Sequence, residues 1–414
     1  MLFFYRILIN LVLLLSPIII LFRIIKKKEH PTRFLEKLGI SSKNRMQGKV
    51  IWFHGSSVGE VLSIMPLIER LEKNSKIKQI VITSSTLSSS KVLEKYKLNK
   101  TVHQFFPIDA NLIIKKFLNY WKPTAVFFVE SEIWPNTIQN LHKRNIKIVL
   151  LNARITNKTF TKWFKFKSFS KDIFNKFDLC LCQNKETKIY LKKLGTKNIK
   201  NLGNLKFSES KKIKKINKIK NFKLLNNKNI LFGGISTHYD EEIFCGKVHL
   251  ELKNKYKKFI SIIIPRHVNR AESIKNDLEN LKLKVHLHSS KINIENDTDI
   301  YLVDTYGETK SFLNMCKVVY LGGSIIKRGG QNPLEAARSG CKVIHGSNVN
   351  NFKEIYALLN NIGVSSKING VKDAKIKIIK NLKTNVKQKK NIVKINQLGR
   401  KILNSINLEI RNLI

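Results

Sequence analysis

The chain has 414 residues, 43% of them hydrophobic, and carries a formal net charge of +48 at pH 7. This length accommodates two domains with sizeable cores, and this hydrophobic fraction excludes a wholly disordered chain. The charge suits a membrane or a phosphorylated lipid, or reflects a lysine-rich composition; without zinc-finger spacing or an RNA-binding aromatic motif, no nucleic acid partner is expected.

An apolar stretch lies near the start of the chain. Residues 7–22 are apolar at all but three positions, and the lysines at 26–28 follow directly. A spanning helix needs about 20 apolar residues, so this stretch is short, and no small-residue cleavage site follows it. Because lysines favour the cytoplasmic side, we expect residues 1–28 to be an uncleaved membrane anchor, spanning or interfacial, with the rest of the chain in the cytosol.

Strand-like and helix-like segments alternate through the rest of the chain. Near-continuous apolar strands that alternate with helices predict parallel sheets covered on both faces. The lysine- and asparagine-rich stretch 208–228 contains no strand-like run and is expected to be a linker. The predicted fold class is therefore α/β, with two doubly wound domains at 29–207 and 229–414 and a cleft between the carboxyl ends of their strands. The expected strands lie at 50–53, 80–82, 124–129, 146–151, 179–181, 230–232, 259–264, 300–303, 318–321 and 343–344.

The five cysteines include no C-x-x-C pair, and their odd number fits structural thiols in a reducing compartment. Cys180 and Cys182 alternate in an apolar run and should face the same side of one strand. The triplet Asp297-Thr298-Asp299 resembles the D-x-D metal motif of some glycosyltransferases. It directly precedes a strand-like run, which favours a strand-entry loop, and no metal site is expected.

Polar residues follow directly after the expected strands, which a purely structural α/β protein would not need. In the first cluster, His54 to Glu60, Gly59 loosens the turn and Glu60 falls in the first turn of the next helix. There the helix dipole favours an ionised carboxylate, ready to accept a proton from a hydroxyl. An ordinary acidic helix start is the alternative. Further clusters lie at 130–136, 152–154, 203–206, 236–238, 265–270 and 304–308.

The stretch 320–346 combines an apolar run, two pairs of glycines and a helix-like segment that starts at Asn332. Glycines before a helix let backbone N–H groups reach a phosphate. Glu335, one turn into the helix, is placed to accept hydrogen bonds from ribose hydroxyls. The stretch is therefore either the nucleotide end of a sugar-nucleotide site or a plain α/β turn.

Together these motifs resemble the 3-deoxy-D-manno-octulosonic acid (Kdo) transferases of lipopolysaccharide synthesis, inverting glycosyltransferases of GT-B fold. The matching motifs, in family order within residues 54–335, are HGSSVGE, VESEIWPN, LNARIT, GNLKF, STHYDEE, PRHVNR, DTYGE and GGSIIKRGGQNPLE. The resemblance implies two Rossmann-like domains facing a cleft, behind an N-terminal membrane anchor helix. It implies transfer of Kdo from CMP-Kdo to a lipid A precursor, lipid IVA, without a cofactor. The implied location is the cytoplasmic side of the cell inner membrane, with its anionic lipids as partners.

The same resemblance implies roles for individual residues. Glu60 is the general base, and Glu130 and Lys206 stabilise the transition state. Gln331 departs from the family, which usually has histidine there; glutamine still forms hydrogen bonds but cannot titrate. The implied CMP-Kdo site comprises Pro265, Arg266, Tyr306, Gly307, Glu308, Asn332, Pro333, Leu334 and Glu335, although the family often has methionine where Tyr306 stands. Further candidates are Ser57, Gly59, Arg154, Gly322, Gly323 and Ser324.

The chemistry of the residues agrees with these roles. A sugar leaving CMP develops oxocarbenium character, so the departing phosphate needs fixed positive charge from groups such as Arg266 and Lys206. Direct displacement by an activated hydroxyl predicts inversion. Another GT-B transferase, a nucleotide-sugar epimerase and an inactive membrane-bound scaffold are the alternatives. A scaffold has no use for Glu60, Glu130, Lys206 and Arg266 together.

Overall fold

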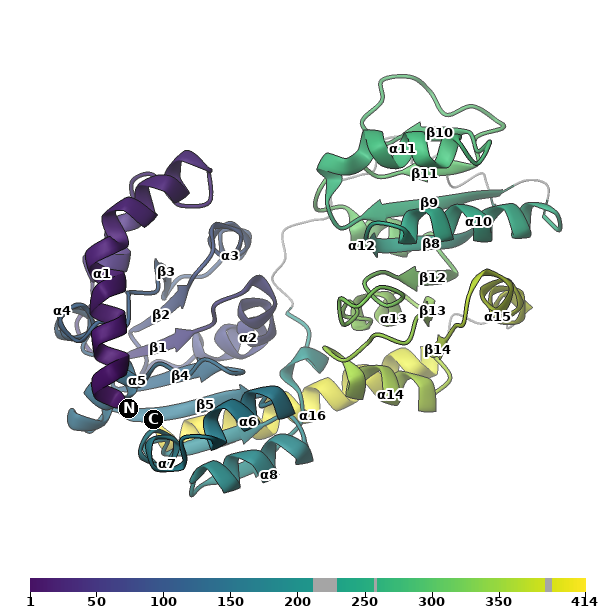
Figure 1. Cartoon of the computed structure of the whole chain (residues 1–414). Coiled ribbons are helices and arrows are strands. Elements are labelled where there is room, and N and C mark those ends of the chain that lie inside the picture. The colour runs from purple at the N-terminus through teal and green to yellow at the C-terminus, as the bar shows by residue number, and fades with distance from the viewer. Residues whose placement is uncertain (211–228, 257–258, 384–388) are drawn as a thin grey trace. The chain divides into compact units, whose positions relative to one another are not determined.

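A computed structural model describes residues 1–210, 229–256, 259–383 and 389–414 (Figure 1). The chain forms two compact units, one made of Met1–Lys214 with Asn396–Ile414 and the other of Lys215–Ile395. Each unit contains a seven-stranded sheet, and all the described strand pairs are parallel. The predicted α/β class with two doubly wound domains is thus confirmed. Most of the expected linker at 208–228 lies outside the described residues.

The sheet of the first unit has the strand order β3-β2-β1-β4-β5-β6-β7. Because β1 pairs with β2 on one side and with β4 on the other, the strand order reverses between β1 and β4. Doubly wound sheets bind ligands at such a switch point. The strands are β1 (Val50–His54), β2 (Gln79–Ser84), β3 (Thr101–Phe105), β4 (Ala125–Val129), β5 (Lys147–Ala153), β6 (Leu179–Cys182) and β7 (Ile199–Asn201).

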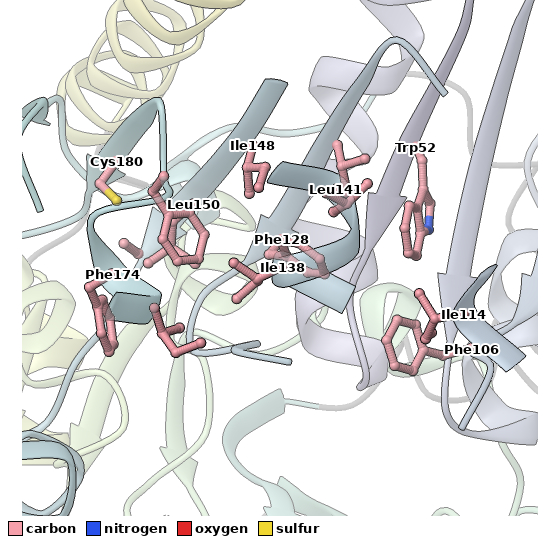
Figure 2. Packing of buried hydrophobic residues seen from close by; sticks show 14 of the residues in the cluster. Trp52, Phe106, Ile114, Phe128, Ile138, Leu141, Ile148, Leu150, Phe174 and Cys180 are labelled. Atoms are coloured by element: carbon pink, nitrogen blue, oxygen red, sulfur yellow. The ribbon is translucent and has the colours of Figure 1, made fainter. Parts of the chain in front are cut away.

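One face of this sheet packs against helices and forms the core in Figure 2. Trp52 of β1 and Phe128 of β4 are fully buried there, with ring centroids 5.9 Å apart. Side chains alternate along a strand, so Phe53 and Phe127 point to the opposite face, where their rings stack at 4.5 Å. Each fully buried large apolar side chain contributes about 1.5–3 kcal/mol. The helices of the first core are α4 (Asn111–Trp121), α5 (Pro135–Lys143), α7 (Lys167–Phe174) and α8 (Lys185–Leu194).

The second unit repeats this architecture with the strand order β10-β11-β9-β8-β12-β13-β14. Its switch point lies between β8 and β12, since β8 pairs with β9 on its other side. One apolar cluster involves α10, α11 and α15, and the other involves α12, α13 and α14. The strands are β8 (Asn229–Thr237), β9 (Phe259–Pro265), β10 (Val285–Leu287), β11 (Ile300–Leu302), β12 (Val318–Leu321), β13 (Lys342–His345) and β14 (Ser365–Lys367). The helices are α10 (Glu241–Lys253), α11 (Ala271–Glu279), α12 (Thr309–Leu313), α13 (Leu334–Arg338), α14 (Lys353–Asn361) and α15 (Val371–Lys383).

The last helix, α16 (Lys389–Leu413), differs from expectation. The sequence analysis assigned all of 229–414 to the second domain, but Asn396–Ile414 belongs to the first unit. At Gly399 the helix approaches that unit so closely that a Cβ atom would lie 1.9 Å from the carbonyl oxygen of Phe207. The physical reason is that the apolar face of the helix is buried against the first unit. Within Asn396–Ile414 the buried apolar residues of the helix are Ile402, Leu403, Ile406 and Ile410.

The first helix, α1 (Leu2–Ile25), is long and apolar enough to cross a membrane, by length and composition only. Near its start the hydroxyl of Tyr5 donates to the carboxylate of Asp109 at 2.6 Å. Near its end Nε of Arg23 donates to Glu29 at 3.0 Å. Most of its large apolar side chains are nevertheless exposed. The bond to Asp109 ties the start of the helix to the sheet domain, the bond to Glu29 is local, and much of the apolar surface of the helix stays uncovered.

Isolated residues singled out in the sequence have structural roles. All five cysteines are free and buried, and Cys180 and Cys182 face the same core. Asp299 of the D-x-D triplet pairs with Lys253 at 2.6 Å and accepts from the N–H of Lys284 at 3.0 Å, which supports a strand-entry loop. Across the described ranges, no group of three or more His, Cys, Asp or Glu side chains is arranged to hold a metal ion.

Candidate active site

Glu60 lies at the switch point of the first unit, in the first turn of α2 (Val58–Leu71). Its carboxylate accepts hydrogen bonds from the N–H of Ser56 at 2.7 Å and from the hydroxyl of Ser57 at 3.0 Å. The Ser57 hydroxyl in turn caps the helix by accepting from the N–H of Glu60 at 3.3 Å. A Cβ atom added at Gly59 would meet nothing within 4 Å, so the turn is open on that side. Glu60 is thus held in place yet partly exposed.

The pKa of Glu60 is raised above its ordinary value of 4.5 to about 7. Burial is the largest cause, followed by the negative charges of Glu132 and Glu130, and the hydrogen bonds from the serines offset only part of the effect. The helix dipole was expected to favour the ionised carboxylate, but the net shift of the pKa is in the opposite direction. Desolvation and two like charges outweigh the helix start. A carboxyl group with a pKa near 7 suits general base catalysis at neutral pH.

Glu132 is a second carboxylate at this switch point, in the loop after β4. Its Oε2 accepts from Nε2 of His54 at 3.1 Å, from the hydroxyl of Ser56 at 2.7 Å and from Nε1 of Trp134 at 2.9 Å. Burial by itself would raise the pKa of Glu132, but these hydrogen bonds and the interaction with His54 lower it overall. On its other side, Nδ1 of His54 lies 3.0 Å from Oγ1 of Thr83. Glu132 and His54 both stand in the sequence motifs, but no role was predicted for either of them.

Glu130 and Lys206, to which the family resemblance gives a shared role, lie together. Nζ of Lys206 is 2.6 Å from Oε1 of Glu130, and their side chains are only 13% and 9% exposed. Glu130 has a φ of 58°, a left-handed conformation that is uncommon outside glycine and frequent at functional sites. The carbonyl of Glu130 accepts from the N–H of Arg154 at 3.2 Å, which brings this further candidate to the same strand end.

A buried amide network positions the turn that carries Lys206. Oδ1 of Asn152 accepts from the N–H of Leu205 at 2.9 Å, and Nδ2 of Asn204 donates to Oε1 of Gln183 at 2.5 Å. Nε2 of Gln183 closes the network on the carbonyl of Asn152 at 3.3 Å. The sequence marked Asn152 and Asn204 as polar residues after strands. The only signal for Gln183 was its position directly after β6.

In the second unit, the glycine-rich turn after β12 binds a carboxylate of the chain itself. The side chain of Glu241 is fully buried, and its oxygens accept from the N–H groups of Gly323 at 2.7 Å and of Ser324 and Ile325 at 3.1 Å each. The sequence analysis expected these glycine-turn N–H groups to reach a phosphate. Glu241 already accepts the hydrogen bonds of the groups at 323–325, so a phosphate would have to use other donors of the stretch, and the prediction is untested for the glycine pair at 329–330. Gly322 provides close packing here, since a Cβ atom would lie 2.2 Å from a backbone oxygen.

Basic side chains surround this turn. Arg266 is exposed directly after β9, and His238 follows β8 with its ring centroid 5.8 Å from that of His267. The pKa of His238 is lowered, first by burial and then, against the raising effect of Glu241, by the charges of His267, Arg328 and Arg266. These groups therefore lie near one another and form a positive surface of side chains at the carboxyl ends of the strands.

The predicted residues after β11, Tyr306 to Glu308, differ in how exposed and how firmly held they are. Tyr306 is 70% exposed, and Gly307 adopts a φ of 97° with open space where a Cβ atom would lie. Glu308 is held by Nε2 of His288 at 3.0 Å and by the hydroxyl of Thr305 at 2.6 Å. The structure thus fixes the carboxylate of Glu308 while leaving Tyr306 accessible.

The predicted run after the glycine-rich turn forms the start of α13. The helix begins at Leu334, two residues later than expected, because Asn332 turns back and accepts the N–H of Leu334 at 3.1 Å. Pro333 is buried beside it, whereas Glu335 is exposed. Pro265, the remaining predicted residue, is buried at the end of β9.

The chain is similar in sequence to a family of known proteins. Residues 32–209 match the family described as 3-Deoxy-D-manno-octulosonic-acid transferase (kdotransferase). The 3-deoxy-D-manno-octulosonic acid transferase of Rickettsia prowazekii (strain Madrid E) is 33% identical, over 74% of this chain and 66% of that protein, just under two thirds of its length. That of Rickettsia bellii (strain RML369-C) is 32% identical, over 83% of this chain and 82% of that protein.

A solved structure supports the fold alone. The putative UDP-N-acetylglucosamine 2-epimerase from Listeria monocytogenes superposes with a TM-score of 0.57 at 14% identity, over 89% of this chain and 98% of that one. Both chains therefore share the GT-B class of two Rossmann-like domains, and the low identity carries nothing about activity. The sequence relatives decide the family, since their identity extends over most of both chains. This chain belongs to the 3-deoxy-D-manno-octulosonic acid transferase family.

Proposed function

We propose that this protein transfers Kdo from CMP-Kdo to a lipid A precursor, lipid IVA, in lipopolysaccharide synthesis. Family membership supports the reaction class. The single observation that carries the mechanism is Glu60, a partly exposed carboxyl group whose pKa lies at about 7. It stands at a switch point, where sheets of this kind bind their ligands.

The proposed reaction is a direct displacement that needs no metal. The acceptor hydroxyl gives its proton to Glu60 as its oxygen attacks the anomeric carbon of Kdo, and the bond from that carbon to the CMP phosphate breaks. Attack opposite the leaving group inverts the configuration. Glu130 stabilises the positive charge that develops on the sugar, and Lys206, 2.6 Å from Glu130, stabilises the negative charge of the departing group.

The proposed donor site lies in the second unit. The backbone N–H groups at 323–325 of the glycine-rich turn are bonded to Glu241, so side chains provide the main contacts to the phosphate of CMP-Kdo. Arg266, exposed at the end of β9, supplies two parallel N–H groups to phosphate oxygens. The exposed carboxylate of Glu335 accepts hydrogen bonds from the ribose hydroxyls. The remaining predicted residues, Tyr306 to Glu308 and Asn332 to Leu334, complete the contacts to the nucleotide.

Product analysis tests this function. Purified protein is incubated with CMP-Kdo and tetra-acylated lipid IVA, and the lipid product is weighed by mass spectrometry. The expected result is a mass increase of one or more Kdo units, together with release of CMP. The same protein incubated with UDP-N-acetylglucosamine should return it unchanged. Epimerised sugar and an unmodified lipid would instead support the epimerase alternative, and no reaction in either assay would support the scaffold alternative.

We further propose that α1 holds the protein on the cytoplasmic face of the inner membrane without crossing it. A spanning helix would have to leave the first unit, yet the start of α1 is bonded to that unit through Tyr5 and through Arg6, whose Nε donates to Oδ1 of Asn136 at 3.1 Å. Its exposed apolar side chains suit the acyl region, and the lysines at 26–28 suit anionic headgroups.

Fractionation tests the attachment. The full chain should sediment with inner membranes and be released by detergent, and removing residues 2–22 should shift most of it to the soluble fraction. Protease added to the outside of spheroplasts, from which the outer membrane has been removed, should cleave neither end of the chain. Equal recovery of both forms in the soluble fraction would contradict attachment, and cleavage from outside would show that α1 spans the membrane.

A further inference from the structure

Ser56 lies between two carboxyl groups at the switch point of the first unit. Its backbone N–H donates to Oε2 of Glu60 at 2.7 Å, and its hydroxyl donates to Oε2 of Glu132 at 2.7 Å. A single residue therefore fixes the distance between the two carboxyl groups. Because the hydroxyl and the N–H belong to the same residue, movement of Glu132 is transmitted to the turn that holds Glu60.

Glu132 is itself firmly held on the side away from Glu60. Its Oε2 accepts from Nε2 of His54 at 3.1 Å and from Nε1 of Trp134 at 2.9 Å. His54 is fully buried and stacks on Phe106 with ring centroids 3.8 Å apart. The side chain of Glu132 thus has one defined position, set by the rings of His54 and Trp134, and the ring of His54 is in turn held by Phe106.

We propose that Glu132 is a positioning residue for Glu60: acting through Ser56, it holds the Glu60 carboxyl group in place and sets the pH range in which that group accepts a proton. The inference rests on the proposed function, in which Glu60 is the general base. Glu132 has no contact with the reacting atoms in this role and acts only through its charge and its hydrogen bond to Ser56.

The surrounding charges support this assignment. The negative groups that face Glu60 are Glu132 and Glu130, and Glu130 is paired with Lys206 at 2.6 Å. Glu132 is held by His54 and by neutral donors instead. In accordance with this difference, Glu132 raises the pKa of Glu60 more than Glu130 does. Removing the charge of Glu132 should therefore make Glu60 a stronger acid.

The decisive measurement is the pH dependence of kcat for Kdo transfer in Glu132→Gln. This change removes the charge and keeps the size of the side chain and an oxygen for Ser56. The parent should lose activity below a midpoint near pH 7, and the variant should keep its activity to a pH about one unit lower, as expected for the loss of a nearby like charge. Glu186→Gln, the same change at an exposed position on α8, is the matched control and should leave the midpoint unchanged.

Two further variants separate the possible failures. Ser56→Ala keeps both carboxylates and removes only the hydroxyl between them; a kcat reduced several-fold, with KM for CMP-Kdo within about twofold of the parent, supports the positioning role. An unchanged midpoint in Glu132→Gln, or an unchanged kcat in Ser56→Ala should Glu132→Gln not fold, overturns it. Parental turnover in Glu60→Gln would instead overturn the general base of the proposed function, whatever Glu132→Gln shows.

Discussion

Glu60 and Glu241 occupy equivalent places in the two units. Each stands in the first turn of the helix that follows a central strand, α2 after β1 and α10 after β8, beside the point where the strand order reverses. Glu241 is fully buried and accepts hydrogen bonds from backbone N–H groups and from the hydroxyl of Tyr320 at 2.5 Å. Glu60 is partly exposed, has fewer donors and faces two like charges.

The difference shows that position in a sheet does not decide what a carboxylate does. Surrounded by donors and removed from water, Glu241 organises a loop and has no access to a substrate. With negative neighbours and an open side at Gly59, Glu60 is kept in a state where gaining a proton is favourable. Four measurements test this difference between the two carboxylates.

The largest effect is expected for Glu60→Gln. Glutamine keeps the size of the side chain but cannot accept the proton of the acceptor hydroxyl, so turnover should fall by about 10²–10⁴-fold. Binding of CMP, which the proposed function assigns to the second unit, should stay close to the parent. Initial rates of CMP release and calorimetry with CMP measure the two quantities. Near-parental turnover would make Glu60 a structural helix-start residue like Glu241.

The second measurement is the stability of Glu241→Gln. The new amide group would face backbone N–H groups that now donate to a carboxylate oxygen, and each buried donor left without a partner costs about 1–3 kcal/mol. We expect the second unit to lose about 3 kcal/mol, seen as a lower melting temperature. Glu272→Gln, at an exposed position early in α11, is the control and should change stability by less than about 0.5 kcal/mol. An unaltered transition in Glu241→Gln would show that the loop does not depend on this carboxylate.

The third measurement concerns the phosphate. Because Glu241 takes the backbone donors of the glycine-rich turn, side-chain donors should dominate binding there. Arg266→Ala should weaken CMP by about one to two orders of magnitude, since hydrogen bonds between charged groups contribute about 1.5–3 kcal/mol. Glu335→Ala should also weaken CMP, through the ribose. If calorimetry gave the parental affinity for both variants, the nucleotide would have to bind elsewhere.

The smallest effect is the pH dependence of stability caused by Glu60. Its folded-state pKa of about 7 lies above the ordinary 4.5, so between these values the folded chain keeps a proton that the unfolded chain has released. The stability that the folded chain gains from the protonated Glu60 is fully present below pH 4.5 and is lost as the pH rises through 7. The free energy of unfolding in urea should therefore be the same for Glu60→Gln and the parent at pH 4.5. At pH 8 it should be higher for Glu60→Gln by on the order of 1 kcal/mol. Equal stability at both values would show that the environment of Glu60 does not disfavour its charge.

The strands that the sequence analysis predicted are the apolar central ones, and the missed strands have physical reasons. The strands β7, β10 and β14 have only three residues each and lie at or near sheet edges, where little apolar surface has to be buried. The strand β3 has only two apolar residues, Val102 and Phe105, and lies at the other edge of its sheet. For α16, the order of residues does not show which of the two units covers its apolar face.

At the site, the motifs placed Glu60, Glu130 and Lys206 at strand ends, and the structure brings the last two into contact. What the sequence lacked was the set of neighbours in space. Nothing in the order of residues shows that Glu132 faces Glu60, and so the direction of the pKa shift was missed. Glu241 lies 82 residues from Gly323 along the chain, and only the packing of α10 against β12 shows that it occupies the glycine-rich turn.

The return of α16 to the first unit has a consequence for the birth of the protein on the ribosome. The surface around Phe207, which Gly399 covers, is made early, but its cover is made only after the whole of Lys215–Ile395. At translation rates of about 5–20 residues per second, the first unit waits on the order of ten seconds or more with this surface open. During that interval the apolar surface that α16 later buries stays exposed, and exposed apolar surface of this kind makes incomplete chains prone to aggregate.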